Sequence, residues 1–234
     1  MRILALDSTA VAASVALCDG EKLLANYTIN LGNTHSETLL PMVEAVLKAA
    51  NLTAADIDLF AASAGPGSFT GVRIGAATVK GLAFGKDKPC IGVSTLEALA
   101  YNLIGFEGIA CPVMNARRSQ VYTATFLVSG GTLTRLTPDR AIAIAELEEE
   151  LLTANHPVYL SGDGYAITRE GFTRLETKDT PAILIPQNGY SVAMCALKQY
   201  ENGVRTTDIE LSPVYLRLSQ AERERAEKQQ ATEI

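Results

Sequence analysis

The chain has 234 residues, 47% of them apolar, which is enough to bury a substantial core in one large domain or two small ones. Its 20 basic and 26 acidic residues give a net charge of −6. That is the wrong sign for a protein whose main task is to bind nucleic-acid phosphates without help. We therefore expect any contact with RNA to be local or to depend on a partner.

The sequence predicts a cytoplasmic protein without a membrane segment. The four cysteines show no C-x-x-C spacing, as expected for reduced thiols in a core. The chain starts on MRILALD, without a basic and then apolar leader. The apolar run at 74–85 contains Lys80 and is shorter than the roughly 18 to 20 residues that cross a bilayer.

The first predicted elements are three strands at 3–7, 12–20 and 22–29, joined by short turns such as DGEK. A helix is predicted to begin near residue 34, because Thr34 and Glu37 have the spacing of a capping box before a helical apolar pattern. Pro41 lies inside this helix and lacks an N–H group, so we expect a kink there.

The chain then alternates between strands and helices. Strands are predicted at 57–63 and 89–94, and helices at 72–84 and 95–103. This alternation is typical of parallel strands joined by crossover helices. The first half is thus predicted to be three antiparallel strands followed by α/β units.

From residue 111 the same order begins again. The pattern predicts strands and helices at 111–115, 119–130, 132–137, 144–154, 158–164 and 188–203. Asn115 takes the place of Asp7 in this register. We therefore predict an α/β protein with two β-β-β-α-β-α domains, at 1–104 and 105–218, and a charged tail at 219–234 that forms a solvated or frayed helix.

A glycine-rich stretch, SAGPGSFTGVRIG, occupies residues 63–75 between a predicted strand and helix. It has neither the G-x-x-x-x-G-K-[ST] spacing of a P-loop nor the G-x-G-x-x-G spacing of a dinucleotide fold. Backbone N–H groups at the start of the next helix would still favour an anion. The sequence leaves two interpretations open, and a simple turn is favoured over a phosphate site.

The helix at 72–84 has few strongly polar side chains, Arg73 and Lys80. Gly71, Gly75, Thr78 and Gly85 form a stripe of small residues along which another helix could approach closely. A helix this apolar is buried on more than one side. It is either an interior helix of this chain or part of a subunit interface.

Other polar candidates are weak when read alone. Asp7, Ser8 and Thr9 end the first strand, where a carboxylate could assist a metal-bound nucleotide, yet the same tripeptide is common in turns. His35 and His156 have no neighbouring ligand at metal spacing. The SGDG sequence at 161–164 would receive a nucleotide or form a turn, and the turn is favoured.

Several longer motifs together closely resemble the TsaB family, also called YeaZ. They are ILALDSTAVAASVAL, THSETLLP, AGPGSFTGVRIG, KGLAFG, IGVSTLEALA, NARRSQVY and PVYLR, which span residues 3–217 and are densest in the first half. The resemblance implies a duplicated actin-like fold of the ASKHA, ribonuclease H-like type. It also implies a role in making threonylcarbamoyladenosine (t6A) next to the anticodon of tRNA.

The motifs also resemble the catalytic relative TsaD, in which a pattern like V-N-H-L-E-G-H supplies a histidine pair to a metal. The matching segment here is VSTLEAL, so Thr95 and Leu99 stand at the two ligand positions. A hydroxyl and an isobutyl group cannot replace two imidazoles. The resemblance thus implies a non-catalytic subunit with no catalytic residue, metal or cofactor of its own, and with ATP and metal held by partner subunits.

The resemblance further implies how the subunit assembles. Helices 34–50 and 70–84 are expected to pair with TsaD, or with a second copy of the chain when TsaD is absent. TsaE is expected to join them, and tRNA to bind only through the complex. The interface residues implied are His35, Leu39, Met42, Val43, Val46, Thr70, Arg73, Ile74, Gly75, Thr78 and Gly81. Gly75→Trp is expected to block pairing while leaving the monomer folded.

Some positions keep alternatives open. Asp7, Ser8, Thr9, Gly65, Gly67 and Ser68 are candidates for a vestigial phosphate loop. Asn115 stands where many relatives are expected to have an acidic residue, which puts a nucleotide or metal role of the second half in doubt. Arg117 and Arg118 are candidates for contacting a partner or an RNA backbone, or for surface salt bridges. The alternative functions are an autonomous actin-like ATPase or kinase and, less favoured, a metallopeptidase.

Overall fold

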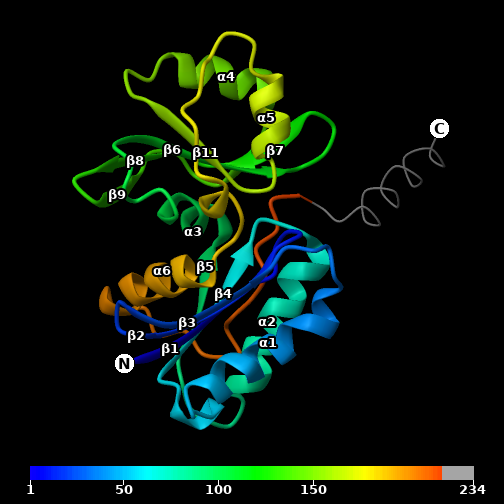
Figure 1. Ribbon diagram of the computed structural model, residues 1–234, viewed down its shortest axis with the longest axis vertical. Helices are drawn as coiled ribbons and strands as arrows, with labels where there is room; N and C mark the ends of the chain where they lie inside the picture. The colour runs from blue at the N-terminus through cyan, green and yellow to red at the C-terminus, as the bar shows by residue number, and fades with distance from the viewer. Residues whose placement is uncertain (218–234) are drawn as a thin grey trace, which may run out of the picture.

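The computed structural model describes residues 1–217, which form two halves that lie one above the other in Figure 1. The first half contains a sheet of strand order β3-β2-β1-β4-β5. Its strands are β1 (Arg2–Asp7), β2 (Ala13–Asp19), β3 (Lys22–Ile29), β4 (Leu59–Gly65) and β5 (Cys90–Ser94). β1 is antiparallel to β2 and parallel to β4. The predicted order of three antiparallel strands and then parallel strands is confirmed.

Alternate residues of β1 face different layers. Leu4 and Leu6 belong to a core formed with helices α1 (His35–Ala49) and α2 (Phe69–Ala83). Ile3 and Ala5 point to the opposite face and belong to a second core. This is the two-residue side-chain period of a strand that is buried on both faces.

Helix α1 begins where the sequence predicts, at the residue after Thr34. The Thr34 side chain makes no capping hydrogen bond, so the predicted capping box with Glu37 is wrong. A capping box does occur at the short helix η1 (Ala54–Asp56). Thr53 is its N-cap residue, and Thr53 and Asp56 form the reciprocal hydrogen bonds of the box. Pro41 lies on the exposed side of α1, and the kink remains a prediction.

The second half repeats the three-strand opening with interruptions. Its strands are β6 (Gly108–Asn115), β7 (Gln120–Thr123), β8 (Phe126–Ser129), β9 (Thr132–Arg135), β10 (Arg140–Ala143) and β11 (Val158–Ser161). β7 and β8 pair with β6 in one continuous register, Val113 with Thr123 and Ala110 with Phe126. They are therefore two parts of one strand, interrupted opposite Pro112, which has no N–H group to donate. β11 adds a parallel strand on the other side of β6.

The last helix of each half packs against the other half. Helix α3 (Thr95–Tyr101) shares a core with β6 and β8 of the second sheet, whereas α6 (Gly189–Glu201) lies on the first sheet, as Figure 1 shows in orange beside the blue strands. Helices α4 (Ile144–Leu152) and α5 (Tyr165–Gly171) and the short helix η2 (Ala182–Leu184) complete the second half. α5 was not predicted from the sequence.

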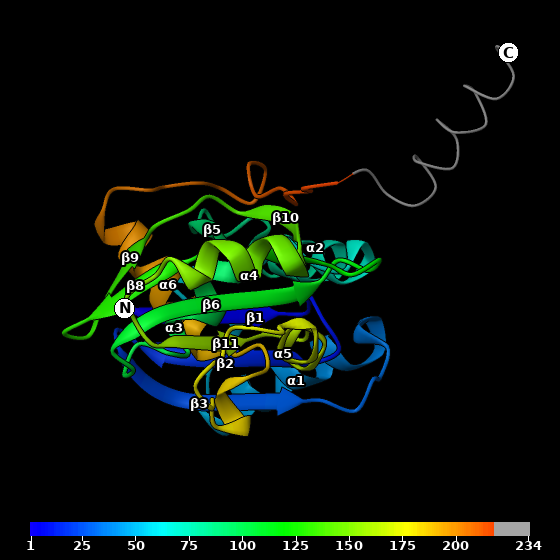
Figure 2. The same ribbon diagram turned by 90° about the horizontal axis from the view of Figure 1, so that it is seen from above.

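The segment after α6, residues 204–217, also returns to the first half, and we call it the C-terminal strap. The N–H of Cys90 donates to the carbonyl of Thr206 over 2.8 Å, and the N–H of Val214 donates to the carbonyl of Ala64 over 2.7 Å. The prediction that 105–218 forms one second domain therefore does not hold for α6, which packs on the first sheet. The strap contacts both halves, because its last described residue, Arg217, donates to the carbonyl of Ala116. Figure 2 shows the strap in orange passing from α6 to the opposite end of the molecule.

The predicted tail at 219–234 lies outside the described residues. Within residues 1–217 no helix is long and apolar enough to cross a membrane. All four cysteines are buried and free, as predicted for core thiols.

Candidate functional site

The glycine-rich loop holds the start of α2 against the end of β1. The N–H of Ser68 donates to the carbonyl of Thr9 over 2.7 Å, and the Ser68 hydroxyl caps α2 by accepting from the N–H of Gly71. A Cβ atom on Gly71 would lie 2.0 Å from the Ser8 carbonyl oxygen, and one on Gly67 would lie 2.6 Å from that of Thr9. The glycines are therefore needed for close backbone packing, which supports the turn interpretation of this loop.

Asp7 is enclosed and its carboxylate is satisfied by neighbours. One oxygen accepts from the N–H and the hydroxyl of Thr9, and the other accepts from the Ser63 hydroxyl. Burial raises the pKa of the Asp7 carboxyl, against the opposing effect of these hydrogen bonds. The Ser8 hydroxyl likewise donates to the carbonyl of Gly71. Because Asp7 is only 1% exposed, the structure presents no open carboxylate here for an autonomous ATPase.

A cleft of about 790 Å³ lies between the two halves. Among the candidates from sequence it brings together Thr9, His35, Gly67, Ser68, Thr70, Asn115 and Arg117. Asp7, Ser8 and Gly65 are not part of its lining. On the far wall Asp163, from the SGDG sequence, accepts from the N–H of Asn115 over 3.1 Å. Desolvation raises the pKa of the Asp163 carboxyl, and the nearby Asp7 carboxyl adds to this rise.

Asn115 was predicted as the position in the second half that corresponds to Asp7, whereas the carboxylate in the cleft belongs to Asp163. The SGDG sequence carried the signal, because it follows a strand as Asp7 does. The cleft also holds His35, whose Nε2 lies 2.6 Å from the carbonyl oxygen of Ala10. This ring is therefore engaged with the loop after β1.

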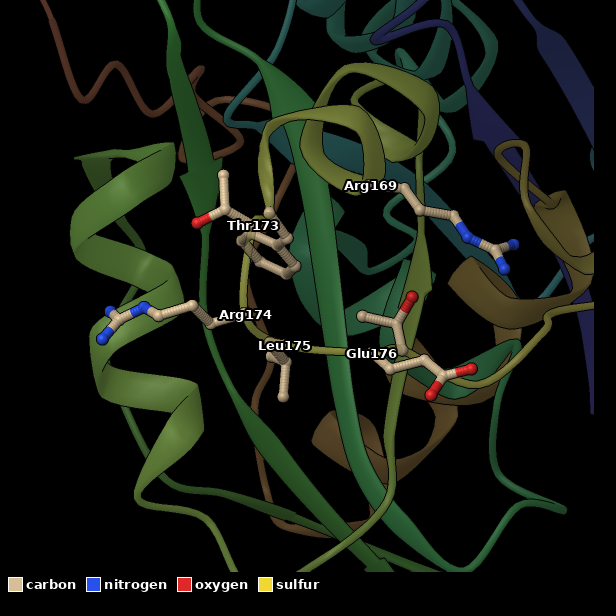
Figure 3. A pocket seen from close by; sticks show the side chains of 7 residues that line it. Arg169, Thr173, Arg174, Leu175 and Glu176 are labelled. Carbon is tan, nitrogen blue, oxygen red and sulfur yellow. The ribbon is translucent and has the colours of Figure 1, made fainter.

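A second, smaller pocket of about 290 Å³ lies beside the loop that follows α5, and Figure 3 shows it. Its two arginines point away from one another in Figure 3. Arg169 pairs with Asp179, and Arg174 pairs with Glu149. Both arginine charges are thus matched by carboxylates of the chain itself.

The two positions that correspond to the histidine pair of TsaD lie on α3. Leu99 is 1% exposed and packs so closely that its Cδ1 would lie 3.1 Å from a Cβ atom on Gly162. Thr95 is fully buried, and its hydroxyl has no hydrogen-bond partner among the described residues. A buried isobutyl group and one hydroxyl do not fit a metal ion. Within residues 1–217 no group of three or more His, Cys, Asp or Glu side chains could hold one.

Comparison with known proteins identifies the family. Residues 22–225 match the family model described as TsaD, tRNA N6-adenosine threonylcarbamoyltransferase. The Bacillus subtilis (strain 168) protein named tRNA threonylcarbamoyladenosine biosynthesis protein TsaB is 32% identical over 230 residues, which are 98% of this chain and 100% of that protein. The chain belongs to the TsaB family. The predicted family is thus confirmed.

Solved structures similar to this TsaB-family chain agree with the fold. YeaZ from Pseudomonas aeruginosa has a TM-score of 0.77 at 26% identity and covers 92% of this chain and 99% of its own. A putative N-acetylmannosamine kinase from Listeria monocytogenes has a TM-score of 0.50 at 12% identity, covering 86% of this chain and 100% of its own, which shows the fold alone. The predicted duplicated actin-like α/β fold is confirmed.

The paired helices of this TsaB-family chain bury several of the residues implied as interface residues. Leu39, Met42, Val43 and Val46 all lie in the core beneath α1. Gly75 is buried on α2, where a Cβ atom would lie 2.7 Å from the Ser8 Oγ. These five positions face the chain's own core and not a partner. The structure gives the opposite expectation for Gly75→Trp, because the tryptophan side chain would be forced against Ser8, directly after β1, and would destabilise the monomer.

The other implied residues lie toward the surface. Thr70, Arg73 and Gly81 are exposed, whereas Ile74, Thr78 and His35 are partly buried. Three further exposed apolar residues were not predicted: Ala77 on α2, Phe84 directly after the end of α2, and Leu40 on α1. The helical spacing 70, 73, 77, 81 and 84 would have found the exposed stripe of α2 once its buried stripe was known.

Proposed function

We propose that this TsaB-family chain is the non-catalytic subunit of the t6A-synthesising complex, where it pairs with TsaD and activates it. The observation that carries the proposal is the filling of the two metal-ligand positions by the buried Leu99 and Thr95. Family membership supplies the reaction, since the full-length relative is named for threonylcarbamoyladenosine biosynthesis. Threonylcarbamoyl transfer to the adenosine then takes place in TsaD, and ATP and metal are held by the partner subunits.

The exposed stripe of α2, together with α1, supports pairing with a partner helix. Ala77 and Gly81 are small enough for a second helix to approach closely, and Phe84 is 75% exposed beside them. In this proposal the stripe pairs with TsaD, or with a second copy of the chain when TsaD is absent. TsaE joins the assembled pair, and tRNA is recruited only by the complex.

The pairing surface is tested by placing one long charged side chain on it. Ala77→Arg adds bulk and charge to the exposed stripe without entering the core. Ala166→Arg makes the same change at an exposed position of α5 in the other half. We expect both variants to keep the wild-type melting temperature, and only Ala166→Arg to co-elute with TsaD in size-exclusion chromatography. Co-elution of Ala77→Arg at the wild-type level would refute this surface.

A further inference from the structure

Four arginines that form no ion pair lie along one line of contacts, and we call them the arginine cluster: Arg73, Arg117, Arg118 and Arg217. Elsewhere in residues 1–217, five arginines have a carboxylate oxygen within 4.0 Å. They are Arg2, Arg135, Arg140, Arg169 and Arg174. Among the described residues the arginine cluster has no such carboxylate. Arg205 also lacks such a carboxylate, but its guanidinium lies over the Tyr200 ring and outside this line of contacts. The cluster therefore contains four of the five arginines without an ion pair among the described residues.

The C-terminal strap connects the cluster to α2. The Arg73 Nε donates to the Tyr215 hydroxyl over 2.7 Å, and its guanidinium carbon lies 5.5 Å from the centre of the Tyr215 ring. Tyr215 in turn stacks on Phe69, with ring centres 4.4 Å apart and planes 9° apart. Arg73 is thus held beside an aromatic pair, and Tyr215 remains 39% exposed.

The strap also connects the cluster to the second half. Two residues after Tyr215, Arg217 donates to the carbonyl of Ala116 over 2.9 Å and to the side chain of Gln120. Ala116 directly precedes Arg117 and Arg118, whose side chains are exposed. Contacts therefore run without a break from α2, through the strap, to the turn between β6 and β7.

That turn holds its arginines in an unusual backbone conformation. Arg117, Arg118 and Ser119 have φ angles of 63°, 53° and 55°, the left-handed region that glycine adopts with less strain. The turn is fixed by hydrogen bonds, because the N–H of Arg117 donates to the Asn115 side chain and the N–H of Gln120 donates to the carbonyl of Arg117. Arginine at positions where glycine would be less strained indicates that the guanidinium groups themselves have a use.

We propose that Arg117 and Arg118, with Arg217 beside them, bind the phosphodiester backbone of RNA, whereas Arg73, which lies on the stripe assigned to the partner helix, holds the strap in place through Tyr215. The inference rests on the proposed function, which makes that RNA the tRNA substrate of the complex. Guanidinium groups pair with phosphate in two parallel hydrogen bonds, and the exposed Tyr215 ring offers a face on which a base can stack. Of the four arginines only Arg117 lines the cleft, so the cluster extends beyond the space that one nucleotide would occupy there. A chain of phosphates fits this extended arrangement better than a single polyphosphate.

The experiment measures tRNA affinity of the complex formed with TsaD, from about 50 to 200 mM salt. The variant Arg117→Ala/Arg118→Ala is compared with Arg117→Lys/Arg118→Lys and with Lys22→Ala/Lys198→Ala. The double lysine-to-alanine variant is the control, because it removes the same two positive charges as the arginine-to-alanine variant. Its two positions are exposed and form no ion pair among the described residues. We expect the arginine-to-alanine variant to bind at least about tenfold more weakly and to lower the slope of log K against log salt by about 1.4 to 1.8, as for two lost phosphate contacts. The lysine variant should keep most of the slope, and the control should match the wild type.

Three results would overturn the inference: wild-type tRNA affinity in the arginine-to-alanine variant, an equal loss in the control, or a loss of ATP affinity in place of tRNA affinity. Co-elution with TsaD is measured on the same samples. A wild-type chain that does not co-elute contradicts the proposed function, and this inference with it. Co-elution with unchanged tRNA affinity overturns the inference alone.

A glycine variant separates binding from a structural role. Arg117→Gly/Arg118→Gly should relieve the left-handed backbone and raise the melting temperature, while lowering tRNA affinity as much as the alanine variant does. If the two arginines served only to hold the turn, stability would fall and tRNA affinity would stay unchanged. That result would also contradict the proposal.

Discussion

The close packing of α2 on β1 makes opposite predictions for two glycines of the same helix. An alanine Cβ at Gly71 would lie 2.0 Å from the backbone oxygen of Ser8, and backbone cannot rotate away. Such overpacking costs up to about 3 kcal/mol, and the better helix propensity of alanine returns at most about 1 kcal/mol. Gly71→Ala should therefore lower the free energy of unfolding by about 2 kcal/mol. At Gly81 a Cβ atom would meet nothing within 4 Å, so Gly81→Ala should raise it by about 0.5 to 1 kcal/mol.

The assay is urea unfolding of both variants at one protein concentration, supported by thermal melts. For a chain of this size, the difference should appear as a fall of about 4 to 8 °C for Gly71→Ala and a rise of up to about 4 °C for Gly81→Ala. Gly81→Ala is the matched control, since it makes the same chemical change in the same helix. A Gly71→Ala protein as stable as the wild type would refute the conclusion that the glycine-rich loop exists for close backbone packing.

Three further predictions test other parts of the structure. Glu148 accepts hydrogen bonds from the N–H groups of three consecutive residues, chiefly that of Arg174, and these bonds hold the pKa of the Glu148 carboxyl below the ordinary 4.5. The stabilisation by the charged carboxylate is present above that pH and is lost as the pH falls. Glu148→Gln should therefore flatten the dependence of the melting temperature on acid pH. Leu99→Ala should cost about 2 to 5 kcal/mol in urea unfolding, and a cost near zero would contradict its buried packing. A double-mutant cycle between Phe69 and Tyr215 should give a coupling of about 0.5 to 1.5 kcal/mol, and additive effects would mean that the strap does not pack on α2.

Local patterns predicted most of the elements. Strand β1 was predicted because its residues are apolar and it ends at a polar turn, and α1 because apolar residues recur at helical spacing. The capping box at Thr34 failed because the sequence gives the spacing but not the direction of the side chain, which remains unbonded. β7 and β8 were predicted as one strand, and their shared register with β6 shows why: the interruption comes from Pro112 on the facing strand, not from their own sequence.

Long-range packing could not be predicted in the same way. Helical spacing identified Leu39 and Val43 as one stripe of α1, but it could not decide whether this chain or a partner covers that stripe. Helix α3 packs on the second sheet and α6 on the first, and no local pattern indicates this. The only related signal is the apolar character of α6, whose residues from Ser191 to Leu197 are all buried. The contacts of the strap with Ala64 join residues 150 positions apart, which no local pattern reports.

The candidate site was likewise predicted where a local motif was sufficient, and not where it depends on long-range packing. The resemblance placed Thr95 and Leu99 at the ligand positions, and the structure adds that Leu99 fills the space beside Gly162. Asp163 was passed over because a turn sequence does not reveal which carboxylates reach a cleft. The arginine cluster depends on the strap, so the sequence could indicate Arg117 and Arg118 but not their connection to Arg73.

The most direct test of the proposed function measures t6A in tRNA by nucleoside analysis, after incubation with the purified chain, threonylcarbamoyl donor precursors and ATP. Because the positions of Thr95 and Leu99 do not fit a metal, we predict no t6A with the chain alone and its full formation once TsaD and TsaE are added. Formation of t6A by the chain alone, in a preparation free of TsaD, would contradict the proposal that it is a non-catalytic subunit.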